Sequence, residues 1–448
     1  MSPSNRVALR WSARVAMSVL AAGVLVLPTV AAAQPHAAAT PSASAAARVA
    51  QLRQEVRSGT LLRDHGVRSV SPRSHVQLVT TAKGSTTPLS TSLPAGNGPA
   101  DLAAAYSLPA TSTSTTTIAI IDAGVDPNLA SDLATYRSTY GLPACTTANG
   151  CLSLENFTGG AQPAPQTSAT GRADEENIAV ETSLDMDMAS AACPSCHLLE
   201  VSIPFQAGFS DSNTSTSEFA TAVRTAVAAG AKAISISYGY TETRTNTSGT
   251  TLSSFNQRGV AITVSTGDSG FNGGTHQDWP SNLPTVIAVG GTTLNGPGNE
   301  TAWSGGGSGC ETRFTGATGQ PAAVTALCGN HRAAADVSSV ADPNTGVAVF
   351  DTYAPSSGQP LNFIIVGGTS ASAPFVGGLF ARAGNLTSVN GPNTLYAAAA
   401  SNFNDVTSGN NEQQNVCANF NIRQKICNAG VGYDGPTGLG TPHGLGAF

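Results

Sequence analysis

The feature that most constrains the fold of this chain is an alternation, from residue 117 onward, between short apolar runs and alanine-rich stretches. Such runs are typical of buried parallel strands, and the stretches between them are typical of covering helices. Residues 218–229, for example, fit a helix that ends before Gly230. We therefore expect an α/β fold with strands at residues 117–121, 198–203, 233–237, 260–265 and 286–289.

Charged residues make up 11% of the chain and are unevenly distributed. Residues 1–84 contain ten Lys and Arg against two acidic residues, whereas residues 85–448 contain 11 basic and 25 acidic side chains. A nucleic-acid partner needs a surface rich in Lys and Arg to neutralise its phosphates. The acidic body of the chain therefore argues against binding to nucleic acid.

The N-terminus has the three parts of a secretion signal. Three arginines within the first 14 residues precede an apolar run at residues 15–30, and small residues follow up to Ala33. The alternative is a membrane anchor, but about 16 apolar residues interrupted by Ser18 and Pro28 are fewer than the ~20 that a spanning helix needs. We expect residues 1–33 to be a signal peptide, and the mature protein to be secreted, extracellular and without membrane attachment.

Residues 34–98 are rich in Ala, Ser, Thr and Pro, with roughly helical apolar spacing at residues 45–62. This composition predicts a linker or a short pro-segment. Residues 99–448 then form one domain that is long enough to build a sizeable core.

Eight cysteines suit an exported chain, and along the sequence they fall into neighbouring pairs. Short closed loops are the simplest hypothesis, although eight cysteines allow 105 connectivities. A CxxC pair can also be a redox or zinc half-site, but there is no second CxxC and no paired-His spacing. The expected pairs are Cys145 with Cys151, Cys193 with Cys196, Cys310 with Cys328, and Cys417 with Cys427.

Ser370 follows an apolar run at residues 363–366 and two glycines, and it precedes a stretch rich in Ala, Gly and Phe. At the start of a helix, backbone N–H groups and the helix dipole favour a developing anion, which suits a nucleophile beside an oxyanion hole. The alternative is a plain helix start with Ser or Thr as the N-cap. Ser370 is therefore a candidate nucleophile.

Glu181 and Asp185 are four residues apart in a segment whose helical interpretation puts both carboxylates on one face. Two carboxylates in contact share protons and titrate together, which would let Glu181 act as a general base at acid pH. The alternative is an exposed carboxylate pair. The acidic residues just before them are expected to be solvated: Asp174, Glu175 and Glu176.

Residues 267–270 are Gly-Asp-Ser-Gly, which is also the signature around the nucleophile of trypsin-like proteases. Those enzymes are all-β and need a histidine in an Ala-Ala-His-Cys setting, which none of the seven histidines here has. We therefore reject a trypsin-type nucleophile. Taken alone, Asp268 would belong to an ordinary Asp turn.

Taken together, these segments resemble the sedolisin family, the serine-carboxyl peptidases that share the subtilisin fold. The resemblance covers the chain from about residue 102 to the C-terminus, and the motifs appear in the family's order. They are residues 118–122, Glu181 with Asp185, residues 235–239, 265–268, 289–292, 336–338, 341–343 and 368–372.

The resemblance implies a subtilisin-like three-layer fold with a central, mainly parallel sheet flanked by helices. It makes Ser370 the nucleophile, Glu181 the general base and Asp185 the acid that orients this base. Asp268 would lend a carboxyl group to the oxyanion hole, where subtilisins place an Asn. Because an Asp donates a hydrogen bond only while it is protonated, activity is expected at acid pH.

Two further residues have supporting roles by this resemblance. Asp122 lies where the family often has an acidic residue that extends the carboxylate network. Tyr238 stands where some members have Trp, and we expect its phenol to tune the network. The family also usually carries a large folded pro-domain, whereas only about 65 residues follow Ala33 here, so either a reduced pro-segment suffices or folding is autonomous.

A true subtilisin would use a triad of Asp, His and Ser, for which Asp122 and Ser370 would serve. Its histidine should open a helix between them in a His-Gly-Thr setting, and none of His197, His276 and His331 has that setting. The sequence therefore disfavours subtilisin-type chemistry.

The C-terminal region resembles the family's calcium site, in which two carboxylates and backbone carbonyls from glycine-bearing loops bind one structural ion. The resemblance gives Asp405 and Asp434 as side-chain ligands of Ca2+. It gives Val406, Gly430 and Gly432 as carbonyl ligands. Without the family, a pair of Asx turns would be the preferred interpretation.

The sequence thus predicts a secreted, calcium-stabilised serine-carboxyl peptidase that hydrolyses peptide bonds at acid pH through an acyl-enzyme on Ser370. We expect protein or peptide substrates, no nucleic-acid partner and a monomer. The alternative is a catalytically silent secreted relative that binds peptides or surfaces. It is supported by the missing pro-domain and opposed by the four intact catalytic positions.

Overall fold

The computed structural model describes residues 73–74, 77–78, 93–204, 212–241, 249–271, 278–358, 360–412 and 424–448. These residues all belong to one compact unit, residues 40–448. The predicted signal peptide at residues 1–33 and the helical spacing at residues 45–62 lie outside the described ranges.

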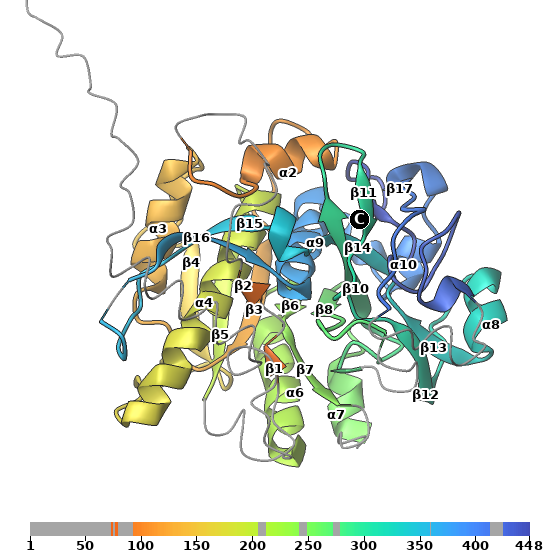
Figure 1. Ribbon diagram of the computed structural model, residues 1–448. Helices are drawn as coiled ribbons and strands as arrows, with labels where there is room; N and C mark the ends of the chain where they lie inside the picture. The colour runs from red at the N-terminus through yellow and green to blue at the C-terminus, as the bar shows by residue number, and fades with distance from the viewer. Residues whose placement is uncertain are drawn as a thin grey trace, which may run out of the picture. The chain divides into compact units, whose positions relative to one another are not determined.

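A mostly parallel sheet forms the centre of this unit (Figure 1). Its strands are β3 (Thr117–Ala123), β4 (Leu152–Asn156), β5 (His197–Ile203), β6 (Ala233–Ile236), β8 (Ala261–Ser265), β10 (Ile287–Leu294), β11 (Glu300–Ala302) and β14 (Val337–Val340). Their order is β11-β10-β8-β6-β3-β5-β4, with β14 paired to β10. Every described pairing in this sheet is parallel except that of β10 with β11. The five predicted strands are confirmed as β3, β5, β6, β8 and β10.

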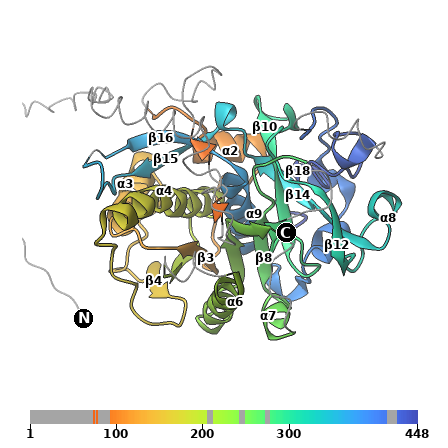
Figure 2. The ribbon, with the colours of Figure 1, turned by 60° about the horizontal axis from the view of Figure 1, so that its bottom comes forward.

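Helices cover both faces of the sheet. They are α4 (Ala169–Ala192) and α9 (Thr369–Ala383) on one face, and α6 (Ser212–Ala228) and α7 (Gly249–Ser254) on the other, where Figure 2 shows the last two side by side. Side chains alternate along β3, so that Ile118 and Ile120 pack in the core with α4 and α9. Ala119 and Ile121 pack in the core with α6 and α7. The predicted three-layer fold is confirmed, and α6 is the predicted helix.

Close packing of α9 against its neighbours depends on two glycines. A Cβ atom at Gly378 would lie 2.5 Å from the Cβ atom of Ala192, at the end of α4. A Cβ atom at Gly377 would lie 2.8 Å from the hydroxyl oxygen of Thr263 on β8. Either side chain would push the helix away from its neighbours. The glycines thus fix the place of α9 and of the residues in its first turn.

Two small antiparallel sheets involve the stretch expected to be a linker or pro-segment. β7 (Tyr238–Thr241) pairs with β1 (Arg73–Ser74) and β9 (Asp278–Trp279), and β16 (Asn362–Gly367) pairs with β15 (Val347–Asp351) and β2 (Gln77–Leu78). Ser74 lies opposite Tyr238, and Gln77 lies opposite Gly367. Residues before position 93 therefore add strands to two elements that carry or precede candidate site residues.

The remaining described elements surround this core. The helices are α2 (Pro99–Ala105), α3 (Leu129–Thr139), α8 (Ala322–Cys328) and α10 (Asn393–Tyr396), and the strands are β12 (Gly309–Thr315), β13 (His331–Ala334), β17 (Phe403–Asn404) and β18 (Thr441–Pro442). Short 3-10 turns are η2 (Pro343–Thr345), η3 (Leu386–Ser388), η4 (Ala400–Asn402) and η5 (Gln424–Ile426).

Three disulfides have the predicted pairing of sequence neighbours: Cys145–Cys151, Cys193–Cys196 and Cys310–Cys328. The zinc or redox alternative for Cys193 and Cys196 is therefore not needed. Cys427 is also disulfide-bonded, and Cys417, its predicted partner, lies outside the described residues.

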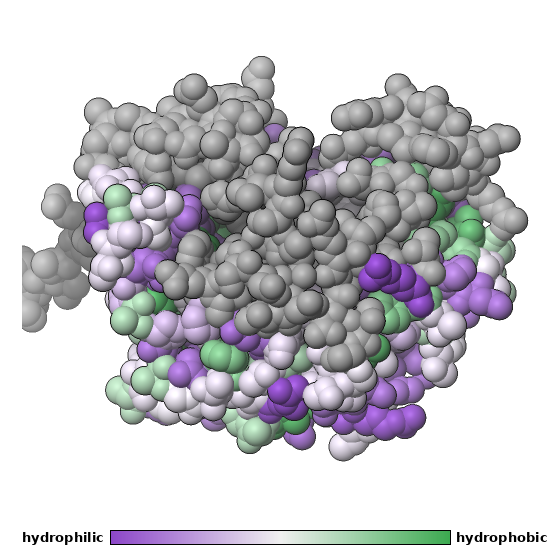
Figure 3. Space-filling model, turned by 90° about the horizontal axis from the view of Figure 1, so that it is seen from below, coloured by the Kyte–Doolittle hydropathy of each residue, from purple (hydrophilic) through white to green (hydrophobic). Residues whose placement is uncertain are grey.

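Figure 3 shows one face of the molecule, on which the coloured hydrophilic and apolar residues are intermixed. Among the described residues, Val431 is the one large apolar side chain that is strongly exposed. None of the described helices combines the length and the apolar character that crossing a bilayer requires.

Candidate active site

Ser370 lies in the first turn of α9, and its hydroxyl is completely buried. Gly368 precedes the helix with a φ of 105°, a conformation that favours glycine and turns the chain from β16 into α9. Gly368 is also the N-cap, so the alternative of a Ser or Thr N-cap is wrong. The Oγ atom of Ser370 lies 3.5 Å from the backbone oxygen of Ser237, to which it donates. The candidate nucleophile thus faces the residue that follows β6.

Glu181 and Asp185 lie in the middle of α4, and both are completely buried. The alternative of an exposed pair is therefore wrong. Burial, followed by the charges of Asp122 and Glu181, raises the pKa of Asp185 well above its usual range. The Ser237 hydroxyl acts in the opposite direction on the same carboxyl group. Ser237 thus lies between the two parts of the site, with its backbone toward Ser370 and its side chain toward Asp185.

Asp122 is the third carboxyl group of this cluster. It is the next-to-last residue of β3 and is completely buried. Burial raises the pKa of Asp122 to about 7, although the nearby Thr182 hydroxyl opposes the rise. At mildly acid pH this group is therefore protonated, which allows several carboxyl groups to share one buried space.

Tyr238 begins β7 and is also buried. Burial, and then the charges of Asp122, Glu181 and Asp185, raise the pKa of Tyr238 well above its ordinary value. Its phenol therefore lies among all three carboxyl groups and stays protonated. The ring packs on Phe219 of α6, with the ring centroids 6.1 Å apart. The structure thus places Tyr238 beside the carboxyl cluster, and its role in tuning that cluster stays a prediction.

Glu200 extends the cluster, although the sequence analysis did not single it out. This buried residue of β5 accepts hydrogen bonds from the hydroxyl of Ser202, at 2.8 Å, and from the side-chain nitrogen of Gln162. Burial, and then the charge of Asp122, raises the pKa of Glu200 well above its usual range. Asp122 on β3 lies opposite Ser202 on β5. Because Glu200 is two residues before Ser202 on the same strand, its side chain projects from the same face of the sheet as that of Asp122. A lone Glu inside the apolar strand at residues 198–203 is the signal that could have revealed it.

Asp268 lies in the turn after β8 and is half-buried. Its Oδ1 atom accepts two hydrogen bonds from Thr369, from the backbone N–H at 2.8 Å and from the hydroxyl at 2.9 Å. The Thr369 hydroxyl oxygen in turn accepts from the N–H of Gly267, at 3.1 Å. Because these bonds join residues about 100 positions apart, a purely local Asp turn is not the explanation. The carboxyl group of Asp268 is held beside the residue that precedes Ser370.

Three of the candidate residues lie at the same edge of the central sheet. Asp122, Ser237 and Asp268 lie at or just after the carboxyl ends of β3, β6 and β8, where ligands bind in open α/β sheets. A buried serine hydroxyl at a helix start lies there near carboxyl groups that hold protons. Such an arrangement can activate a nucleophile and supply protons to a developing anion.

The predicted calcium ligands also come together. Asp434 is completely buried, whereas Asp405 is exposed. Burial is the main cause that raises the pKa of Asp434 to about 7, and the charge of Asp405 adds to the rise. The backbone N–H of Gly430 donates to Asp434, and that of Gly432 donates to Asp405, both at 2.9 Å. Two hard carboxylates from separate segments beside one glycine-bearing loop fit a Ca2+ site. Val406, whose backbone carbonyl oxygen is a predicted ligand, is buried and directly follows Asp405.

Two of the acidic residues expected to be solvated are buried. Glu175 accepts hydrogen bonds from the N–H of Gln166, at 2.9 Å, and from the hydroxyl of Tyr353, at 3.0 Å. Glu176 accepts from two backbone N–H groups, those of residues 356 and 357. The expectation of solvation is therefore wrong, because the chain between β15 and β16 folds over this part of α4.

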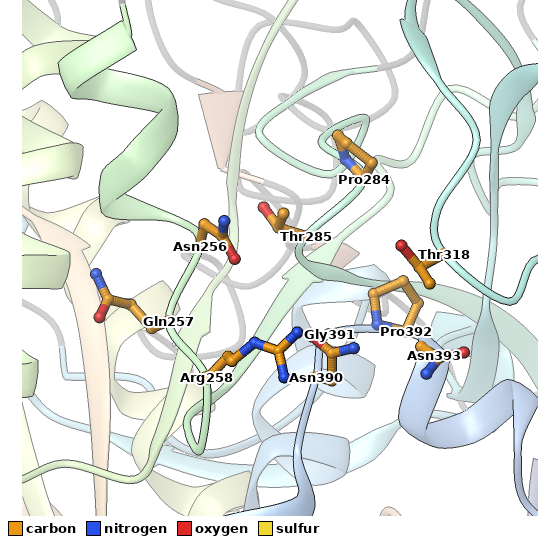
Figure 4. Close-up of a pocket in the computed structure, with 10 residues that line it drawn as sticks. All are labelled: Asn256, Gln257, Arg258, Pro284, Thr285, Thr318, Asn390, Gly391, Pro392 and Asn393. Carbon is orange, nitrogen blue, oxygen red and sulfur yellow. The ribbon is translucent and has the colours of Figure 1, made fainter.

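A separate hollow of about 230 Å³ lies away from this site (Figure 4). Residues 256–258 and 284–285 of its lining precede β8 and β10, so it lies near the amino ends of these strands, whereas the candidate catalytic groups lie at the carboxyl ends. It is lined by Asn256, Gln257, Arg258, Pro284, Thr285, Thr318, Asn390, Gly391, Pro392 and Asn393. None of the predicted catalytic residues is among them.

Comparison with known proteins agrees with the motifs. Residues 113–398 match the model of the subtilase family. Kumamolisin from Bacillus sp. (strain MN-32) is 34% identical over 211 residues, which are 42% of this chain and 35% of that protein. Sedolisin from Pseudomonas sp. (strain 101) is 32% identical over 213 residues, which are 41% of this chain and 33% of that protein. The chain thus spans about a third of the length of these curated relatives.

The fold agrees as well. The structure of a Pseudomonas sedolisin, described as a serine-carboxyl proteinase complexed with two molecules of pseudo-iodotyrostatin, superposes with a TM-score of 0.60 at 25% identity. The match covers 78% of this chain and 95% of that one. The chain therefore belongs to the subtilase family, among the sedolisins, as its motifs predict.

Proposed function

We propose that this chain is a serine-carboxyl peptidase that hydrolyses peptide bonds in proteins or peptides through an acyl-enzyme on Ser370. The observation that carries the proposal is the buried carboxyl cluster of Asp122, Glu181 and Asp185 beside Ser237, whose backbone oxygen accepts from Ser370 and whose hydroxyl acts on Asp185. In this proposal, carboxyl groups supply the base that a subtilisin takes from a histidine. The description of the Pseudomonas sedolisin as a serine-carboxyl proteinase supports the same reaction.

In this proposal, Glu181 removes the proton from Ser370 as Oγ attacks the substrate carbonyl carbon. A C–O bond forms, and the electron pair of the carbonyl group moves to its oxygen. The proton then passes from Glu181 to the amine as the C–N bond breaks, which leaves an ester on Ser370. Water attacks that ester, with Glu181 taking its proton and returning it to the serine. Asp185 orients Glu181 and shares its proton.

Asp268 is the proposed donor to the oxyanion. Its Oδ1 accepts two hydrogen bonds from Thr369, so Oδ2 would carry the proton that the oxyanion needs. The helix start at Ser370 adds backbone N–H groups to the same region. A neutral carboxylic acid donates where a carboxylate would repel the oxyanion, and this requirement favours low pH.

Acid activity is part of the proposal. The raised pKa values of Asp122 and Asp185 keep protons in the cluster at acid pH. As the pH rises through the pKa of about 7 of Asp122, the cluster gains negative charge in a buried space. The proposal therefore has activity falling as the pH approaches neutrality.

We also propose the remaining features expected from the sequence: a signal peptide at residues 1–33, secretion, a pro-segment at residues 34–98 and a monomeric peptidase domain at residues 99–448. The pairing of β1 with β7 and of β2 with β16 supports a pro-segment that covers the strands beside Tyr238 and Gly367. One structural Ca2+ would be held by Asp405 and Asp434 with the carbonyl oxygens of residues 406, 430 and 432. Its role is to neutralise the two carboxylates and hold their loops together.

The test is a pH profile of peptide hydrolysis by the secreted protein beside its Glu181→Gln and Ser370→Ala variants. Activity at acid pH that is lost in both variants is expected. Ser372→Ala is the matched control, because its buried hydroxyl donates only to the backbone oxygens of Ser339 and Val340 among the described residues. Hydrolysis that survives Ser370→Ala would refute the proposed nucleophile. A folded, processed protein without activity at any pH would favour the silent, peptide-binding relative.

A further inference from the structure

Three buried carboxylates from separate parts of the chain meet outside the catalytic cluster. Asp126 lies in the turn after β3, Asp132 lies in α3, and Asp351 ends β15. One carboxylate oxygen from each lies within 4.8 Å of the other two, and all three side chains are buried. Like charges at this spacing cannot stay ionised in a buried space unless a cation is present.

Asp351 is the member whose bonding is incomplete. Its side chain is completely buried, and Oδ1 accepts a hydrogen bond from the backbone N–H of Tyr353, at 3.2 Å. Oδ2 is buried without a hydrogen-bond partner. An unsatisfied buried carboxylate oxygen is costly, and a bound cation would satisfy it.

Neutral groups hold the other two carboxylates in place. Asp132 accepts from the backbone N–H of Thr352, at 2.7 Å, and from its hydroxyl, at 2.8 Å. Asp126 accepts from the N–H of Asn128, at 2.8 Å, and from the hydroxyl of Ser183, at 3.4 Å. Within the described part of the chain, no Lys or Arg forms an ion pair with any of the three carboxylates. The local hydrogen bonds thus orient the group but leave its charge uncompensated.

We infer that Asp126, Asp132 and Asp351 form a Ca2+ site that is distinct from the one proposed at Asp405 and Asp434. The donors are all hard oxygens, which suit Ca2+, and the cluster contains no His or Cys, which zinc and copper prefer. Mg2+ fits less well, because it usually keeps several waters and binds through one or two carboxylates.

The position of this site gives it a structural role near the catalytic residues. It joins the turn after β3 and the helix α3 to the end of β15, whose hairpin partner β16 leads directly into Ser370. The Ser183 hydroxyl that donates to Asp126 lies on α4 between Glu181 and Asp185. A bound Ca2+ would therefore brace the elements that carry the nucleophile and its base.

The test counts Ca2+ ions bound at neutral pH by the full secreted protein, after chelator treatment, using isothermal titration calorimetry with Ca2+ itself. All proteins carry Ser370→Ala to prevent self-digestion. We expect two ions per chain in this parent, one in Asp351→Asn and one in Asp405→Asn. Glu155→Gln, which removes a half-buried acid on β4, is the matched control and should keep both. Mg2+ should bind the Asp351 site at least tenfold more weakly.

This experiment tests the two Ca2+ sites independently of each other. If Asp405→Asn, in which the three-carboxylate cluster is intact, binds no Ca2+, or if Asp351→Asn binds as many ions as the parent, the inference is overturned and the carboxyl groups share protons instead. Asp132→Asn provides a second variant if Asp351→Asn does not fold. None of these counts depends on peptidase activity, so failure of the proposed reaction would leave the result interpretable.

Discussion

Thr369 holds Asp268 through two hydrogen bonds to a single carboxylate oxygen, from its backbone N–H at 2.8 Å and from its hydroxyl at 2.9 Å. Since Thr369 directly precedes Ser370, this pair of bonds fixes a carboxyl group from the turn after β8 relative to the start of α9. The distance between the proposed nucleophile and the proposed oxyanion donor is thereby set by two adjacent residues of one helix.

Substitutions of Asp268 should separate the need for a donor from the need for a proton. Asp268→Ala removes the donor and should lower kcat by about 100-fold to 1,000-fold, as loss of an oxyanion-hole donor does elsewhere. In Asp268→Asn, the amide oxygen can still accept from Thr369 while the NH2 group donates at any pH. We expect this variant to retain more activity and to lose it less steeply as the pH rises. A pH profile of kcat for both variants is the measurement, and equal loss in the two would contradict the role of Asp268 as donor.

Stability should fall with rising pH because of Asp122. Its pKa is about 7 in the folded protein, above its ordinary value of 3.8, so the folded state binds the proton more tightly than the unfolded state. The favourable contribution is complete below about pH 4 and is lost as the pH rises toward 7, by up to about 4 kcal/mol for this group. Asp122→Asn should make the free energy of unfolding less dependent on pH in this range.

Urea unfolding of the Ser370→Ala protein at pH 4, 5.5 and 7, with and without Asp122→Asn, measures this dependence. From pH 4 to pH 7 the free energy of unfolding should fall more for the protein with Asp122 than for the Asp122→Asn variant. If their free energies of unfolding change in parallel from pH 4 to 7, Asp122 does not titrate as the structure indicates.

Removing Ca2+ should lower the melting temperature through the site at Asp405 and Asp434. A ligand present at about 1,000 times its Kd stabilises a protein by about 4 kcal/mol, which corresponds to a shift of several degrees in a domain of this size. Asp405→Asn should reduce the difference between Ca2+-loaded and chelated protein, measured by calorimetry, and Glu155→Gln should leave it unchanged. A difference that is the same in Asp405→Asn and the parent would argue against this site.

The buried ion pair between Arg332 and Asp336 should be sensitive to the loss of one partner. Both side chains are completely buried, and the guanidinium donates to both carboxylate oxygens, at 2.7 and 2.5 Å. Asp336→Asn leaves the buried charge of Arg332 uncompensated and should reduce the free energy of unfolding by about 3–5 kcal/mol. The double variant Arg332→Met with Asp336→Leu should be less destabilised than the sum of its single variants, as denaturant unfolding of the cycle would show. Additive losses would mean that the two side chains act independently.

The motifs predicted the sheet and pointed to the residues of the buried carboxyl cluster, because each motif depends on local sequence. The strand that ends near Asp122 and the turn around Asp268 are contiguous segments, and parallel strands bring their carboxyl ends to one edge. The four-residue spacing of Glu181 and Asp185 likewise fixes their shared helix face. What these patterns could not give is burial, which made an exposed pair equally plausible until the packing of α9 against α4 was known.

The three-carboxylate cluster shows where sequence reasoning stops. Asp126 and Asp132 are six residues apart, but Asp351 follows more than 200 residues later and reaches them only because β15 packs beside α3 and α4. The same packing buries Glu175, for which the sequence offered only its position in a run of acidic residues. Contacts of this kind depend on how layers stack and leave no periodic signal along the chain.

The three described disulfides each close a short ring, with sequence separations of 6, 3 and 18 residues. None of them ties one layer of the fold covalently to a distant segment. A peptide bond cut outside these rings would therefore yield fragments that these three crosslinks do not hold together. For a chain proposed to digest proteins, resistance to cleavage by other copies of itself then depends on how rarely the packed layers open. Once a loop has been cut, these three disulfides do not keep the fragments together.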